Sequence, residues 1–104
     1  MEYDSKLRSA ELDELFQAVL SLQTVEDCYR FFEDICTISE IKAIAQRLEV
    51  ARLLDGNVTY HEISSQTGAS TATISRVNRC LLYGAGGYRL ALDRMKGPEE
   101  ETEG

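Results

Sequence analysis

The sequence lacks most of the patterns that mark metalloproteins and enzymes. It has one histidine, His61, and three cysteines in 104 residues, and no cysteine pair has C-x-x-C spacing. Because structural zinc sites need four such ligands at short spacings, we predict no metal and no cofactor. The histidine has no nucleophile and carboxylate that the sequence can place beside it, so we expect no enzymatic activity. The glycine-rich segment 83–87 lacks the spacing and the lysine of a phosphate-binding loop, which indicates a flexible connector.

Long apolar runs are missing as well. No stretch approaches the roughly 20 residues of a transmembrane helix, and the N-terminus, MEYDSKLRSAELDE, contains no apolar secretion signal. We therefore expect a cytoplasmic protein that does not bind membranes. With an odd number of cysteines, we expect Cys28, Cys36 and Cys80 to be buried thiols that pack as small apolar side chains.

The charged residues are unevenly distributed along the chain. The net charge of −7 does not by itself favour binding to nucleic acid. Residues 1–41 carry three basic and ten acidic side chains, residues 42–96 carry eight basic and four acidic ones, and residues 97–104 add four glutamates. The basic surplus of +4 therefore lies in the second half of the chain, where we expect any contact with a polyanion.

The spacing of apolar residues predicts an all-α protein with no strand and no internal repeat. A serine or threonine stands where each of five helices needs an N-cap, and Thr37 with Glu40 and Thr59 with Glu62 form T-x-x-E capping boxes. With their caps, the expected helices cover residues 9–22, 24–35, 37–54, 59–67, 70–82 and 88–96. They form one domain over residues 9–96, between a flexible N-terminus (1–8) and an acidic disordered tail (97–104).

The helix that follows Thr24 has an unusually large apolar face. Its inner side carries Cys28, Phe31, Phe32 and Ile35, with Tyr29 near the edge. This is more apolar surface than one thin pair of helices covers, so we favour an interface between subunits over the core of a monomer. The long helix has an apolar stripe of Ile41, Ile44, Ala45, Leu48, Ala51 and Leu53 or Leu54, and the apolar residues of the last helix include Leu90, Ala91 and Met95.

Residues 59–82, TYHEISSQTGASTATISRVNRCLL, have the pattern of a helix-turn-helix. Gly68 can supply the left-handed residue that ends the first helix, and Ser70 can cap the second. In the second helix Ile74, Val77 and Leu81 form a narrow apolar stripe, for which Ile63 is the packing partner. The other face has small, polar and cationic residues and no carboxylate, which suits the major groove of DNA: Thr71, Ala72, Ser75, Arg76 and Arg79. An ordinary α-hairpin joined at a glycine would show a similar pattern.

The stretch Gly68-Ala69-Ser70-Thr71-Ala72-Thr73-Ile74-Ser75-Arg76, together with the helix from Thr37 through Arg47, resembles the Trp repressor superfamily. The resemblance is closest to its Trp-repressor-related YerC/YecD branch and covers about residues 9–96. The G-A-x-x-A-T-I-S/T-R stretch is specific, whereas the N-terminal helices match in pattern only. The resemblance implies a six-helix fold and an intertwined homodimer, in which the N-terminal helices and the last helix of one chain wrap the other.

The resemblance also implies which residues face DNA. The family's DNA-facing positions fall on His61 and Ser64 of the first helix and on Thr71, Ala72 and Ser75 of the second. We assign the last three to base edges and His61, Ser64, Arg76 and Arg79 to phosphates or flanking bases, and we include the cap Ser70 in the DNA-binding set. Two-fold symmetry would present two such helices about 34 Å apart to a palindromic site.

A remnant of the family's tryptophan pocket is implied too. Its threonines fall on Thr37 and Thr73 and its arginines on Arg47 and Arg76, which could hold a carboxylate. The glycine beneath the indole ring is Val77 here, and the serine that takes the amino group is Cys80. Because a β-branched side chain fills the slot for the ring, we predict that L-tryptophan does not bind. The filled slot could instead hold the recognition helices ready for DNA.

Three of these residues have a second interpretation. Arg76 serves either DNA, the remnant pocket or only the solvated surface; Thr37 is first of all a helix cap; and Arg47 could bridge to the acidic N-terminal half. We predict a DNA-binding transcription regulator, a repressor that binds palindromic double-stranded DNA as a homodimer without L-tryptophan. The alternative is a dimeric protein–protein interaction module whose helix-turn-helix has lost DNA binding, which the net charge and the acidic tail favour slightly.

Overall fold

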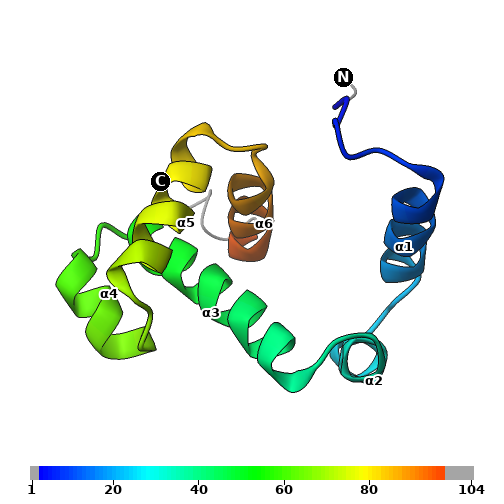
Figure 1. Ribbon diagram of the computed structural model, residues 1–104, viewed down its shortest axis with the longest axis horizontal. Helices are drawn as coiled ribbons and strands as arrows, with labels where there is room; N and C mark the ends of the chain where they lie inside the picture. Colours follow the sequence, from blue (N-terminus) through cyan, green and yellow to red (C-terminus); the bar gives the residue numbers. More distant parts are fainter. Residues whose placement is uncertain (1–2, 98–104) are drawn as a thin grey trace. The chain divides into compact units, whose positions relative to one another are not determined.

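The computed structural model describes residues 3–97, and within them the chain forms six α-helices and no strand (Figure 1). The helices are α1 (Ala10–Leu20), α2 (Val25–Ile35), α3 (Ile38–Asp55), α4 (Tyr60–Thr67), α5 (Thr71–Tyr83) and α6 (Gly87–Lys96). None of these helices is both long and apolar enough to cross a membrane. The prediction of a six-helix, all-α fold is confirmed, while the acidic tail, except for Gly97, lies outside the described residues.

The chain divides into two compact units between Ile41 and Lys42, although α3 is continuous through this point. We call residues 3–41 the N-terminal unit and residues 42–97 the C-terminal unit, and each is considered by itself.

The helices begin at the caps expected from the sequence. The side-chain oxygens of Ser9, Thr24, Thr59 and Ser70 accept hydrogen bonds of 3.0 to 3.2 Å from the amides three residues later. At the start of α3 the capping box is complete. The Glu40 amide donates to Thr37 Oγ1 at 3.1 Å, and the Thr37 amide donates to Glu40 Oε1 at 2.9 Å. These bonds satisfy amides that have no partner within the helix, so each start is determined locally.

The buried side chains of the described residues all belong to the C-terminal unit. They come from four helices and the turn between α4 and α5: Val50, Ala51, Leu53, Ile63, Ala69, Ile74, Val77 and Leu92. The stripe expected on α3 is therefore only partly right, because Val50 is fully buried whereas Ile44 and Ala45 are exposed. Helices α4, α5 and α6 all contribute to the core around the second half of α3 (Figure 1), so its buried face is wider than one stripe.

Helix α6 is attached by residues that the sequence pattern did not single out. Leu92 is 4% exposed, whereas Leu90, Ala91 and Met95 are exposed in the single chain. Tyr88, one turn before Leu92, is half-buried and packs against the core. The i, i+4 pair of Tyr88 and Leu92 therefore forms the inner face of this helix.

A group of ion pairs joins α6 to the C-terminal end of α3. Arg89 donates to Asp55 Oδ1 at 2.6 Å and to Asp93 Oδ1 at 3.1 Å, and Lys96 Nζ lies 3.6 Å from Asp55 Oδ2. The hydrogen bond from Arg89 is the main cause that lowers the pKa of Asp55, and the charges of Arg89 and Lys96 add to it. The carboxylate therefore stays ionised and paired throughout the neutral range.

The N-terminal unit contains no fully buried side chain in residues 3–41. Phe31 and Phe32 are half-buried, and their rings meet edge to face with centroids 5.3 Å apart. The expectation of buried thiols is wrong for the single chain, since Cys28 is exposed and Cys36 and Cys80 are half-buried. Two short helices cannot enclose their apolar faces, which leaves large apolar side chains exposed: Phe16, Leu20, Val25, Tyr29, Ile35 and Ile38.

The turn between α4 and α5 depends on the backbone of Gly68. Its φ of 77° lies in the left-handed region, and no atom lies within 4 Å of the Cβ that a side chain would add there. Gly68→Ala is therefore expected to lower the free energy of unfolding by about 1 kcal/mol through backbone strain alone. The control is Gly87→Ala, which adds a methyl group to equally open space without a positive φ. Urea unfolding at one protein concentration measures both, and equal effects would contradict the prediction.

Candidate nucleic-acid interface

Helices α4 and α5 form a compact helix-turn-helix. The left-handed Gly68 ends α4, and Ser70 caps α5 two residues later. Ile63 of α4 and Ile74 and Val77 of α5 are fully buried in one cluster. The short turn and the shared core agree with the predicted helix-turn-helix.

The turn itself is closed by hydrogen bonds within the motif. Thr67 Oγ1 donates to the Ile63 oxygen at 2.7 Å and accepts from the Ala69 amide at 3.1 Å. Ser64 Oγ donates to the Ala69 oxygen at 3.0 Å, and the Gly68 amide donates to the Ser64 oxygen at 2.9 Å. Because Ala69 is buried, its backbone groups need partners, and these bonds supply them within the turn.

The face of α5 opposite the core is open to solvent. Every residue assigned to this face from the helical spacing is exposed: Thr71, Ala72, Ser75, Arg76 and Arg79. Ile74 and Val77, which lie between them in the sequence, are at most 1% exposed. The structure therefore presents these five side chains together on one surface, and their contact with DNA stays a prediction.

The remaining residues of the predicted DNA-binding set differ in their exposure and in their hydrogen bonds. His61 is exposed in the first turn of α4. Ser70 Oγ accepts from the Thr73 amide and donates to Thr73 Oγ1, both at 3.1 Å, while the Ser64 hydroxyl donates within the turn. Since a serine hydroxyl has one proton, neither Ser64 nor Ser70 has a proton left for a phosphate in this conformation. Their predicted DNA contacts stay untested.

Ion pairing leaves unpaired positive charge on α5 and in the middle of α3. Three of the four carboxylates of residues 42–97, all except Glu62, pair with cations at the end of α3 and on α6: Arg52 with Glu49, Arg89 with Asp55 and Asp93, and Lys96 with Asp55. Arg47, Arg76 and Arg79 take part in none of the ion pairs found among residues 42–97. These arginines therefore keep their charge available for an anion outside this unit.

Three positions of the predicted remnant pocket affect the pKa of Tyr88. Burial is the largest cause that raises the pKa of Tyr88, and the Cys80 thiol raises it further, while the charges of Arg47 and Arg76 lower it. Tyr88 itself packs against the core of the C-terminal unit.

The other pocket positions have different surroundings. Val77 is 1% exposed and belongs to the core. Thr73 is half-buried and accepts a hydrogen bond from Ser70. Thr37 belongs to the N-terminal unit, where it caps α3 as its second interpretation predicted.

Sequence reasoning missed two residues that connect α3 and α6 to the motif. Tyr88 packs on the core, which its spacing from Leu92 could have indicated. Gln46 Nε2 donates to the Thr67 oxygen at 3.2 Å. No sequence signal marks such a glutamine, because glutamines on helices ordinarily face solvent.

The fold and the exposed face of α5 define a helix-turn-helix protein of the class of DNA-binding transcription regulators. The profile of the Trp repressor protein family matches residues 10–96. The chain belongs to this family.

Individual relatives agree with this assignment. The chain is 62% identical over 97 residues to uncharacterized protein YerC of Bacillus subtilis. The aligned region covers 93% of this chain and 93% of that protein. The crystal structure of a TrpR-like protein from Eubacterium eligens is similar with a TM-score of 0.85 and 51% identity, over 88% of this chain and 95% of that one. The crystal structure of a candidate Trp repressor from Staphylococcus aureus is similar with a TM-score of 0.84 and 53% identity, over 88% of this chain and 91% of that one.

Proposed function

We propose that this protein is a repressor that binds a specific palindromic DNA sequence as a homodimer and blocks transcription by occupying its site. The observation that carries the proposal is the exposed face of α5, which is polar, free of carboxylates and includes arginines that form no ion pair with the described residues. Thr71, Ala72 and Ser75 are small enough to let the helix approach base edges in the major groove. Arg76 and Arg79 would contact phosphates or flanking bases.

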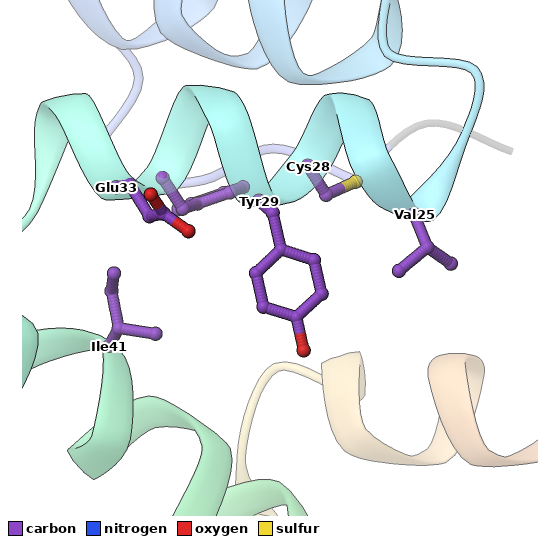
Figure 2. A pocket seen from close by; sticks show the side chains of 6 residues that line it. Val25, Cys28, Tyr29, Glu33 and Ile41 are labelled. Carbon is purple, nitrogen blue, oxygen red and sulfur yellow. The ribbon is translucent and has the colours of Figure 1, made fainter.

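The homodimer is supported by an uncovered apolar surface in the N-terminal unit. A groove of about 250 Å³ on α2, which we call the α2 groove, is lined by Val25, Cys28, Tyr29, Phe32, Glu33 and Ile41. Figure 2 shows Val25, Cys28 and Tyr29 on one side of α2, with Ile41 of α3 across from Glu33. Val25 and Tyr29 are 74% and 65% exposed, so a folded single chain would leave this surface in water.

Charge complementarity favours a second copy of this chain as the partner. Residues 1–41 have a balance of −7 and residues 42–96 a balance of +4. The first part of one copy would therefore attract the second part of another. A two-fold dimer would also present two α5 helices to the half-sites of a palindrome, about 34 Å apart.

Two binding assays test the proposal. Electrophoretic mobility shift with random duplex at low salt is expected to show weak binding, because the basic surplus is modest. Selection of bound sites from a random duplex pool is expected to enrich a palindrome whose half-sites lie about one helical turn apart. If neither assay detects a complex, the protein–protein interaction module is the better description.

L-tryptophan is expected not to bind. Val77 stands where the resemblance places the glycine beneath the indole ring, and its side chain is already part of the core. Inserting a ring there would displace packed side chains at a cost of about 1–3 kcal/mol or more. Calorimetric titration at millimolar ligand is expected to give no saturable heat, with Val77→Gly as the variant in which the slot is reopened. A saturable heat from the unaltered protein would contradict this prediction.

A further inference from the structure

The helix-turn-helix receives one side-chain hydrogen bond from outside the motif among residues 3–97. Gln46, in the middle of α3, donates its Nε2 to the backbone oxygen of Thr67 at 3.2 Å. The two residues are 21 positions apart in the sequence and both are half-buried. Every other side-chain bond of the turn comes from the motif itself.

The oxygen that Gln46 contacts is one that α4 cannot satisfy alone. Thr67 is the last residue of α4, and carbonyls in the last turn of a helix have no amide partner within it. The amide of Gly68 is already used by the Ser64 oxygen. Gln46 therefore caps the C-terminal end of α4 at the point where the chain turns towards α5.

Gln46 is itself held in a defined position. Val50 lies one turn later on the same face of α3 and is fully buried, as is its neighbour Ala51. The backbone from which Gln46 extends is thus anchored in the core, and its side chain reaches the end of α4 from there.

We propose that Gln46 is a positioning residue for DNA recognition. It holds the C-terminal end of α4. Through Gly68 and Ala69 it thereby sets the direction in which α5 begins. The first helical turn of α5 carries Thr71 and Ala72.

The inference rests on the proposed function, since it concerns how the same surface contacts base edges. Hydrogen bonds to base edges need an accurately placed helix, whereas arginine contacts to phosphates tolerate a small displacement. Gln46 therefore acts on sequence selectivity more than on total affinity.

The chain offers a matched control for this residue. Gln66 of α4 lines the same groove beside the turn as Gln46 but is exposed and makes none of the side-chain hydrogen bonds found among residues 3–97. Gln46→Met and Gln66→Met each replace a glutamine with a side chain of similar length and helix propensity that has no N–H donor. Gln46→Lys keeps a donor of similar reach.

Hydrogen exchange in the absence of DNA measures how firmly Gln46 holds the turn between α4 and α5. The amides of Gly68, Ala69 and the first turn of α5 are expected to exchange about fivefold faster in Gln46→Met, which corresponds to the loss of one partly buried hydrogen bond. Gln66→Met and Gln46→Lys are expected to keep the wild-type rates. Equal exchange in the two methionine variants would overturn the proposal.

Binding to the selected site and to random duplex completes the test. In Gln46→Met the ratio of the two affinities is expected to fall about fivefold, while Gln66→Met keeps the wild-type ratio. An unchanged ratio with altered exchange would overturn the role in DNA recognition. If the unaltered protein binds no DNA, the proposed function fails, and the exchange data still decide whether Gln46 positions the turn.

Discussion

Ser75→Glu is expected to lower the affinity for the selected DNA site by about 100-fold or more while leaving the fold intact. Ser75 is exposed in the middle of the outward face of α5 and is not part of the core, so the fold is expected to tolerate a longer side chain there. Its carboxylate would bring a negative charge into the groove between the phosphates and would also lie one turn from Arg79, whose charge it would partly neutralise. Like charges brought together in an interface cost several kcal/mol, which gives this factor. Fluorescence anisotropy at fixed salt measures the affinity, and circular dichroism checks the helix content.

Gln66→Glu is the control for this substitution. It adds the same charge to the same motif at an exposed residue that lines the groove between α3 and α4. We expect its affinity to stay within a few-fold of the unaltered protein, because Gln66 belongs to α4 and is not one of the residues predicted to contact DNA. If the two variants bind DNA equally well, α5 does not enter the groove, and the proposed DNA-reading face is wrong.

Tyr29→Glu is expected to raise the dissociation constant of the homodimer by about 100-fold or more. Tyr29 lines the α2 groove beside Val25 and Cys28, where an uncharged side chain suits an apolar partner. Burying an unpaired carboxylate in such an interface costs several kcal/mol. Sedimentation over a range of protein concentrations measures the dissociation, and affinity for the palindrome is expected to fall with it.

Arg30→Glu serves as the control for the dimer. It introduces the same side chain at the next position of α2, where the Arg30 side chain is 77% exposed and pairs only with Glu26 among the described residues. A dissociation constant within a few-fold of that of the unaltered protein is expected. Dimers that survive Tyr29→Glu would place the interface elsewhere, and an unaltered protein that sediments as a monomer at micromolar concentration would remove the dimer altogether.

Much of the candidate interface could be predicted from the sequence. The exposed face of α5 follows from a helical period that places Ile74 and Val77 inside and Thr71 and Ser75 outside. The sequence could not show that the hydroxyl of Ser64 is used within the turn. Nor could it show that burial raises the pKa of the Tyr88 phenol. Both facts depend on which backbone and side-chain groups meet after the helices have packed.

The sequence by itself determined the helices and the turn, because these depend on neighbours in the chain. A cap such as Ser70 contacts an amide three residues away, and the left-handed turn at Gly68 requires only the absence of a Cβ.

Only the tertiary structure decided which of several apolar residues are buried and which polar groups are joined. Leu92 is buried while Leu90 and Met95 are exposed, although all three are apolar residues of one short helix. Gln46 meets Thr67 across 21 positions of sequence, and Arg89 meets Asp55 across 34. The physical reason is that such contacts form between surfaces brought together by packing, and local preference within a helix carries no information about what lies opposite it.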